Sequence, residues 1–270
     1  GAKATETFCT AASGATPCAG GDGDDDMWSG SGANVMYGDQ GEDSIVCQLG
    51  ATSIVYGGDQ DDTITGTACG LLTAHGELGD DQIFGSAGND TLWGGPGHDA
   101  IAGDIGDDTI YAGSGDDSVN GDDGDDLIFL GPGDDYADGG RQSDTIFGED
   151  GDDAIDGDNS SSPMDGPDFL SGGDGADFLT GKEGNDVLCG GLDGSGQDEL
   201  EGGPGNDVVW GLDATGSIGS RSNFGTGAGY GSGGVDSCDT LSTPGYTSCA
   251  IALTVIPDFC LNGIVIPEDD

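Results

Sequence analysis

The chain has 270 residues, of which 53 are Asp or Glu and only four are Lys or Arg, so its formal net charge at pH 7 is −49. Such a chain repels nucleic acid and anionic membranes, and it has no apolar run long enough to span a bilayer, so we expect neither partner. A cation is the partner that this charge favours. Low hydrophobicity with high net charge is typical of disorder, which is the state we expect of the metal-free chain.

Residues 1–19 come before any regular pattern, and we interpret them as an N-terminal extension or cap. Cys9 and Cys18 lie close together in this segment, and we expect them to form a local disulfide. The whole chain has eight cysteines, an even number that favours an oxidising compartment. We therefore expect a secreted protein, either extracellular or at the cell surface.

A nine-residue repeat occupies residues 20–210. Gly85–Trp93 is GSAGNDTLW, Gly94–Ala102 is GGPGHDAIA and Gly202–Trp210 is GGPGNDVVW. The shared frame is G-G-x-G-x-D-x-U-x, in which U is a large apolar residue, and we count twenty units. One extra residue falls near Tyr56 and another within residues 66–75, and longer loops interrupt the frame at 157–171 and 190–201.

This frame resembles the RTX nonapeptide repeat of the hemolysin-type calcium-binding family. The resemblance implies an all-β fold, a right-handed parallel β-roll, with calcium ions bound between its turns. The residues support the same fold independently, because glycine tolerates the positive φ of a tight turn and x-U-x is a short strand with U on one face.

Two units make one coil of eighteen residues, so we expect about ten coils, which at roughly 4.8 Å spacing give two parallel sheets about 48 Å long. The strands that end odd-numbered units form one sheet, and those that end even-numbered units form the other. The inward rows that we expect are Met27, Ile45, Ile64, Ile83, Ile101 and Val119 on the first sheet, facing Met36, Ile54, Leu92, Ile110 and Ile128 on the second.

Calcium prefers six to eight oxygen ligands. The resemblance implies that the sixth-position Asp of one turn, its counterpart in the next coil and loop carbonyls surround each ion. In odd-numbered units this position is Asp25, Asp43, Asp62, Asp81, Asp99, Asp117, Asp135, Asp153, Asp177 and Asp198. In even-numbered units it is Asp90, Asp108, Asp126, Asp144, Asp168, Asp186 and Asp207. We expect about fifteen Ca²⁺ ions.

Fifth-position acids such as Asp24, Asp61, Asp80, Asp107, Asp116, Asp125 and Asp134 are interpreted as solvated.

The first three even-numbered units depart from the pattern, with Asn34, Thr52 and Leu71 in place of Asp, and we expect no calcium there. Cys47 and Cys69 lie in two of these turns, in adjacent coils on the same side. We predict a disulfide between them that joins the turns where metal cannot, although two unrelated cysteines are the alternative.

Catalysis has little support in the sequence. The chain has two histidines, His75 and His98, and no H-E-x-x-H zinc motif. Both are interpreted as surface residues, and we expect neither a catalytic site nor an organic cofactor.

An aromatic face is predicted on the outside of the second sheet. Its ninth-position row is Tyr37, Val55, His75, Trp93, Tyr111, Phe129 and Phe147, of which Trp93, Tyr111, Phe129 and Phe147 recur at eighteen-residue spacing. Apolar patches of this size mark a contact surface. The chain's own C-terminal segment, self-association through this face and glycan stacking are the three alternatives.

Residues 211–270 end the repeat with a Gly/Ser-rich linker and a segment that we interpret as a disulfide-bearing cap or an assembly segment. We expect a local Cys238–Cys249 disulfide, and elimination then pairs Cys189 with Cys260. Terminal strands of this segment are a second possible means of self-association.

The sequence therefore predicts a secreted, calcium-stabilised structural protein of an extracellular matrix, surface layer or filament. The alternative is a calcium-dependent polysaccharide-binding or adhesin module of a larger secreted enzyme or adhesin.

Overall fold

The computed structural model describes residues 6–9, 17–30, 32–47, 52–158, 165–193, 198–213 and 237–238. In this part of the chain all secondary structure is β, in two parallel sheets. None of the described residues forms a helix that could span a lipid bilayer.

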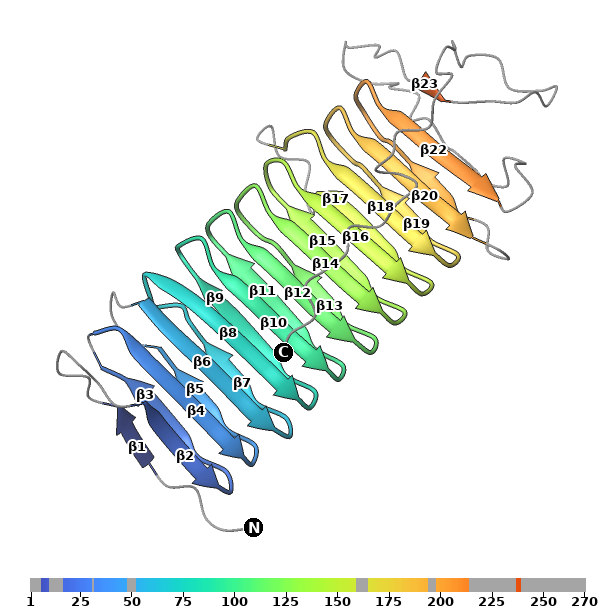
Figure 1. Cartoon of the computed structure of the whole chain (residues 1–270). Coiled ribbons are helices and arrows are strands. Elements are labelled where there is room, and N and C mark those ends of the chain that lie inside the picture. Colours follow the sequence, from blue (N-terminus) through green and yellow to red (C-terminus); the bar gives the residue numbers. More distant parts are fainter. Residues whose placement is uncertain are drawn as a thin grey trace.

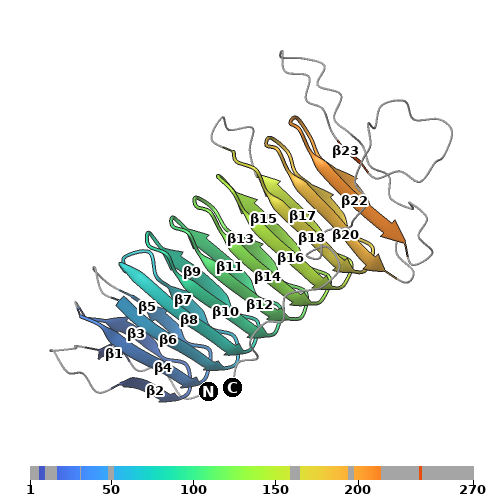
Figure 2. The ribbon, with the colours of Figure 1, turned by 45° about the horizontal axis from the view of Figure 1, so that its top comes forward.

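The strands alternate between the two sheets along the chain, so that each pair of strands completes one coil of a β-solenoid. Figure 1 shows the coils stacked along one axis, from β1 and β2 at the blue end to β22 at the orange end, and the turned view of Figure 2 shows the same rod. The predicted parallel β-roll of about ten two-strand coils is confirmed.

The sheet of odd-numbered strands, called here the odd sheet, begins before the repeat, because β1 pairs with β3 in register. Its described strands are β1 (Glu6–Cys9), β3 (Asp26–Ser29), β5 (Ser44–Val46), β7 (Thr63–Thr65), β9 (Gln82–Ser86), β11 (Ala100–Asp104), β13 (Ser118–Asn120), β15 (Tyr136–Gly140), β17 (Ala154–Asp158), β19 (Phe178–Thr180) and β21 (Glu199–Glu201).

The other sheet, called the even sheet, extends beyond the repeat, because β23 pairs with β22. Its described strands are β2 (Cys18–Asp22), β4 (Asn34–Gln40), β6 (Thr52–Asp59), β8 (Leu71–Leu78), β10 (Thr91–Pro96), β12 (Thr109–Ser114), β14 (Leu127–Pro132), β16 (Thr145–Asp150), β18 (Phe169–Asp174), β20 (Val187–Asp193), β22 (Val208–Asp213) and β23 (Ser237–Cys238).

The core is one row of apolar side chains from each sheet, since the U residue points inward while its two neighbours point out. The odd row is Met27, Ile45, Ile64, Ile83, Ile101, Val119, Ala137, Ile155, Leu179 and Leu200. The even row is Met36, Val55, Ala74, Leu92, Ile110, Ile128, Ile146, Leu170, Leu188 and Val209. Each coil thus buries two such side chains, a thin core for eighteen ordered residues.

One predicted register is wrong by a single residue. Val55, not Ile54, is the inward residue of β6, because β6 pairs with β4 so that Met36 faces Val55 and Tyr37 faces Tyr56. The extra residue of this unit therefore precedes Val55 in the sequence and does not follow it.

Candidate cation-binding edges

The turns that lead into the two sheets form two long edges of the rod, called here the odd edge and the even edge after the strands that follow them. All seventeen predicted ligand aspartates lie in these turns, just before a strand, and the side chain of each is at most 5 % exposed. Carboxylates are seldom buried this deeply without a partner. Each edge therefore contains a column of buried acidic groups.

One oxygen of each carboxylate joins neighbouring coils. The backbone N–H of Asp43 donates to Oδ1 of Asp62 in the next coil, at 2.7 Å. Along the odd edge this bond repeats from Asp25 to Asp198 with N···O distances of 2.7–3.2 Å. Along the even edge it runs from Leu72 to Asp207, at 2.6–3.0 Å. Oδ1 is thus part of the ladder that stacks the coils.

The other oxygen, Oδ2, has no hydrogen-bond partner among the described residues in thirteen of the seventeen aspartates, although it is out of contact with solvent. Those thirteen are Asp43, Asp62, Asp81, Asp99, Asp108, Asp117, Asp126, Asp135, Asp144, Asp153, Asp168, Asp177 and Asp186. A buried polar oxygen without a partner costs free energy, and such groups in native proteins commonly mark a missing ion or water.

Glycine at the first position of the repeat keeps space open beside Oδ2. A Cβ on Gly38 would overlap Oδ2 of Asp43 and the carbonyl oxygen of Gly57 in the next coil. The same overlap recurs on the even edge, where a Cβ on Gly121 would meet Oδ2 of Asp126 and the carbonyl of Gly139. Each such cradle is therefore lined by carboxylate and carbonyl oxygens from two adjacent coils.

Burial disfavours the ionised form of these carboxylates when no cation is bound. Desolvation raises the pKa of Asp62 to about 8 and that of Asp144 to about 9, and the neighbouring aspartates of the same column add to the rise. Hydrogen bonds from the backbone of Asp43 and Asp126 lower these pKa values but do not offset the burial. Without metal, carboxylates such as those of Asp62 and Asp144 would hold protons near neutral pH.

The donor set fits calcium. All the ligands would be hard oxygen atoms, which calcium prefers. Metals that favour thiolate or imidazole ligands would find neither in these cradles. Among the described residues no three Asp, Glu, His or Cys side chains converge on one point. The carbonyl groups of the turns would therefore complete the coordination, as in other calcium sites that mix carboxylate and backbone oxygens.

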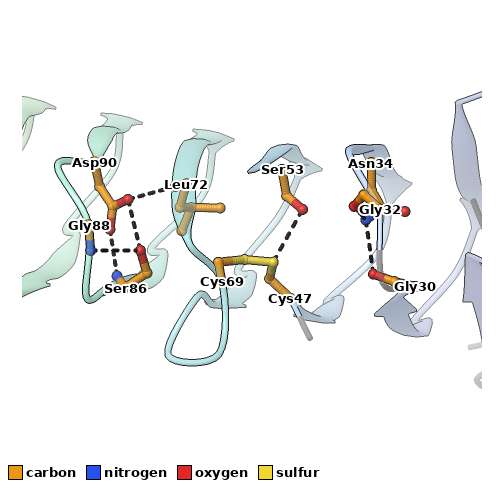
Figure 3. Close-up of a disulfide and its surroundings, with 10 residues drawn as sticks. All are labelled: Gly30, Gly32, Asn34, Cys47, Ser53, Cys69, Leu72, Ser86, Gly88 and Asp90. Carbon is orange, nitrogen blue, oxygen red and sulfur yellow. Dashed lines mark hydrogen bonds between the residues drawn. A yellow bond between two sulfur atoms is a disulfide. The ribbon is translucent and has the colours of Figure 1, made fainter. Parts of the chain in front are cut away.

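The first coils of the even edge lack this arrangement. Pairing of β4, β6 and β8 places Asn34, Ser53 and Leu72 in the row of Asp90, so the expected positions Thr52 and Leu71 are each wrong by one residue. None of the three is an aspartate, and the absence of calcium from them remains a prediction. Figure 3 shows the four side chains in successive coils.

The predicted Cys47–Cys69 disulfide is present at this place. Both cysteines are buried in the apolar core, and Leu72 beside them occupies the space that an aspartate takes elsewhere, since a Cβ on Gly66 would meet its Cδ2. A covalent bond and an apolar side chain thus fill the edge where the carboxylates are missing (Figure 3).

Two turns of the odd edge differ from the others at a position for which the repeat pattern predicted glycine. Ala112 and Leu130 occupy the first position, where the other turns of this edge have glycine, and both side chains are fully buried in the core. In the glycine turns a Cβ at this position would overlap Oδ2 of the aspartate, so these two turns leave less space for a cation beside Asp117 and Asp135. A comparison of first positions along the sequence would have found this signal. We expect these two cradles to bind calcium most weakly.

The fifth-position acids are exposed, as predicted, and form a second ladder outside the first. Oδ1 of Asp61 accepts from the backbone N–H of Asp80 at 3.0 Å, and Oδ1 of Asp134 accepts from that of Asp152, also at 3.0 Å. Water already stabilises the negative charge of these exposed carboxylates, so they do not need a bound cation.

The pH dependence of the metal-free protein follows from these pKa values. An unfolded aspartate titrates near 3.8, whereas burial raises the pKa of Asp81 to about 6, of Asp62 to about 8 and of Asp144 to about 9. The folded state then binds protons more tightly than the unfolded state, so metal-free stability should fall as pH rises from about 4 to about 9.

We expect the β circular-dichroism signal of chelated protein to be strongest near pH 5 and weakest near pH 9. Calcium added at pH 6.5 should release protons, which a weakly buffered titration with a pH electrode detects. A metal-free β signal that increases with pH would contradict the assignment of the buried carboxylates.

The remaining cysteine pairs fall outside the described side chains. Cys18 and Cys189 are both disulfide-bonded, and the side chains of their partners are not among those that the structure describes. The predicted pairs Cys9–Cys18, Cys189–Cys260 and Cys238–Cys249 therefore remain predictions.

The aromatic face is a continuous stack of rings on the even sheet. It consists of Tyr37, Tyr56, His75, Trp93, Tyr111, Phe129 and Phe147, with centroids 4.3–5.5 Å apart, and Phe169 adds a tilted ring. Tyr56 takes the place predicted for Val55, owing to the register shift in β6. Phe129 and Phe147 are only 6 % and 8 % exposed, and Trp93 and Tyr111 are partly buried.

The predicted cover of this stack is not tested by the structure, which describes only 237–238 within residues 214–270. Cover by this segment and cover by a second subunit both remain open.

Comparison with known families agrees with this geometry. A family model described as the RTX calcium-binding nonapeptide repeat matches residues 19–46, 53–68, 75–110, 103–137, 129–161, 164–194 and 192–214. The unmatched residues 47–52 and 69–74 coincide with the irregular even-edge turns that contain Cys47 and Cys69. No individual curated protein matches the chain.

Proposed function

Because this chain belongs to the RTX calcium-binding nonapeptide repeat family, and is thus a calcium-binding repeat protein, we propose that its seventeen edge aspartates are the calcium ligands. The observation that carries the proposal is the column of buried Oδ2 atoms without hydrogen-bond partners among the described residues, eleven of the thirteen beside a glycine that leaves room for an ion. Calcium bound there would join consecutive coils on both edges. Binding energy would then become folding energy.

We further propose a structural role outside the cell, in a matrix, surface layer or filament. The rod shape, the acidic surface and the buried disulfide support this role, since disulfides persist in oxidising compartments. No catalytic role is part of the proposal.

The rival function, polysaccharide binding through the aromatic face, has less support. Sugars stack on the open faces of aromatic rings, but here each ring face lies against the next ring, at interplanar angles of 3–11° from Tyr37 to Phe147. Only ring edges are left for a ligand. Electron microscopy with and without calcium distinguishes the roles: fibres support assembly, whereas monodisperse rods favour a module.

A matched pair of substitutions tests the ligand assignment. Asp126 is buried with an unpartnered Oδ2, whereas Asp125, its neighbour in the chain, is exposed. Both Asp126→Asn and Asp125→Asn remove one negative charge. We expect Asp126→Asn to lower the calcium stoichiometry by one or two and to raise the calcium midpoint of folding severalfold, because in the arrangement implied by the family each carboxylate would contact the ions of two adjacent gaps. Asp125→Asn should leave both unchanged, and equal effects of the two substitutions would refute the assignment.

A further inference from the structure

The turn between β17 and β18 differs from every other turn of the even edge that the structure describes. In the regular turns the second-position residue precedes the buried aspartate by four positions, as Asp104 precedes Asp108 and Asp122 precedes Asp126. Here Asp158 precedes Asp168 by ten, so six residues are inserted between them. The insertion releases Asp158 from the geometry of the regular turn.

The backbone shows this release. Second-position acids elsewhere have left-handed φ, +76° at Asp104, +72° at Asp122 and +78° at Glu149, and their side chains are partly exposed. Asp158 is not left-handed, and its side chain is only 1 % exposed. It is thus the one second-position acid among the described residues whose carboxylate is buried.

Neither carboxylate oxygen of Asp158 makes a hydrogen bond of normal geometry with a described residue. Burial raises its pKa to about 8, Asp168 is the charge that raises it most, and a contribution from the Glu183 amide lowers it only slightly. The nearest side-chain cation of this region, Lys182, is paired with Asp156 at 3.2 Å. An additional carboxylate therefore lies in an acidic edge, and none of the described residues supplies a compensating positive charge.

Asp158 adjoins a complete cradle. A Cβ on the preceding residue, Gly157, would overlap Oδ2 of Asp168 and would lie 2.9 Å from the carbonyl oxygen of Gly181 in the next coil. Oδ2 of Asp168 has no hydrogen-bond partner among the described residues. The usual carboxylate and carbonyl oxygens are thus present here, and the next residue in the chain adds a buried carboxylate, whereas the corresponding Asp104 and Asp122 are partly exposed.

We propose that Asp158 is an additional calcium ligand and that the cradle of Asp158, Asp168 and the Gly181 carbonyl is the tightest calcium site of the even edge. The inference rests on the proposed function and deepens it, because it ranks the sites. Extra anionic ligands raise calcium affinity in oxygen-ligated sites. The tightest site fills first, so calcium at low concentration should order the coils around β17, β18 and β20 before the rest of the edge.

Asp158→Asn tests the proposal, with Asp104→Asn as the control that removes the same charge from the same position and edge. We expect calorimetric titration of wild-type protein to show a tight class of sites, and Asp158→Asn to weaken one of these at least tenfold. Asp104→Asn should leave that class unchanged. Hydrogen exchange at substoichiometric calcium should show early protection of residues 165–191 in wild type and in Asp104→Asn, and its loss in Asp158→Asn.

Asp158→Gly is a second variant that should fold normally, because glycine occupies this position in other turns, such as Gly140 and Gly203. It should reproduce the loss of the tight site. A wild-type isotherm and protection pattern in both variants would overturn the proposal and show that Asp158 is buried as a neutral acid. Absence of calcium binding by wild-type protein would instead overturn the proposed function itself.

Discussion

Chelation of calcium at pH 8 should unfold most of the rod and abolish its β circular-dichroism signal. Most coils bury only two inward apolar side chains, while their edges place carboxylates in columns joined coil to coil. Each apolar side chain contributes about 1.5–3 kcal/mol, which does not compensate for ordering a whole coil and bringing like charges together. Millimolar calcium should restore the signal, because the ions replace repulsion along each edge with coordination.

Magnesium is the matched control. It requires near-octahedral geometry and retains its waters, whereas the cradles offer carboxylate and carbonyl oxygens fixed by the turns. We expect magnesium at the same concentration to restore much less of the signal. Full β content in a chelated sample at pH 8 would show that the buried aspartates do not need a cation.

Phe129→Asp should be the most damaging single substitution on the outer face of the even sheet. The ring is 6 % exposed and stacks between Tyr111 and Phe147, with centroids 5.1 Å from each. Loss of a buried phenylalanine costs about 3–5 kcal/mol, and the new carboxylate adds a desolvation cost in an already anionic rod. Urea unfolding of the calcium-saturated protein should show this loss as a lower midpoint.

Phe84→Asp is the control on the odd sheet. Phe84 is 40 % exposed, and its register partners are Thr65 and Ala102, so it belongs to no ring stack. Its substitution should cost well under 1 kcal/mol, as is usual for surface positions. If a second subunit covers the stack, Phe129→Asp and Trp93→Asp should also dissociate the assembly, which light scattering would detect. Equal midpoints for the Phe129 and Phe84 variants would exclude a stabilising role of the stack.

The repeat made most of this architecture predictable. Because U and the sixth-position aspartate recur at fixed spacing, one assignment places both the core row and the ligand column for every regular coil. Asp43 and Asp126 are therefore found where the frame puts them, buried before a strand.

The errors lie where the frame is interrupted. In the segment Thr52–Tyr56 both Ile54 and Val55 are apolar, so hydrophobicity alone does not decide which one points inward. Pairing with β4 shows that Val55 is the inward residue. The residues aligned with Asp90 are accordingly Ser53 and Leu72, each one position later than expected.

Asp158 was not predictable for a related physical reason. Acids at its position are directed outward by a left-handed backbone in regular turns, and the inserted residues remove that constraint. Its burial depends on a local conformation that the repeat pattern does not specify.

Anomalous scattering from a crystal of the calcium-loaded protein would locate the ions and so show whether the edge aspartates are their ligands. We expect a column of peaks beside the odd-edge aspartates, weakest next to Ala112 and Leu130, and a second column on the even edge from Asp90 to Asp207. We expect none among Asn34, Ser53 and Leu72, where the Cys47–Cys69 disulfide lies. Strong peaks at those three positions, or calcium bound only to the exposed fifth-position acids, would refute the assignment of the buried aspartates as ligands.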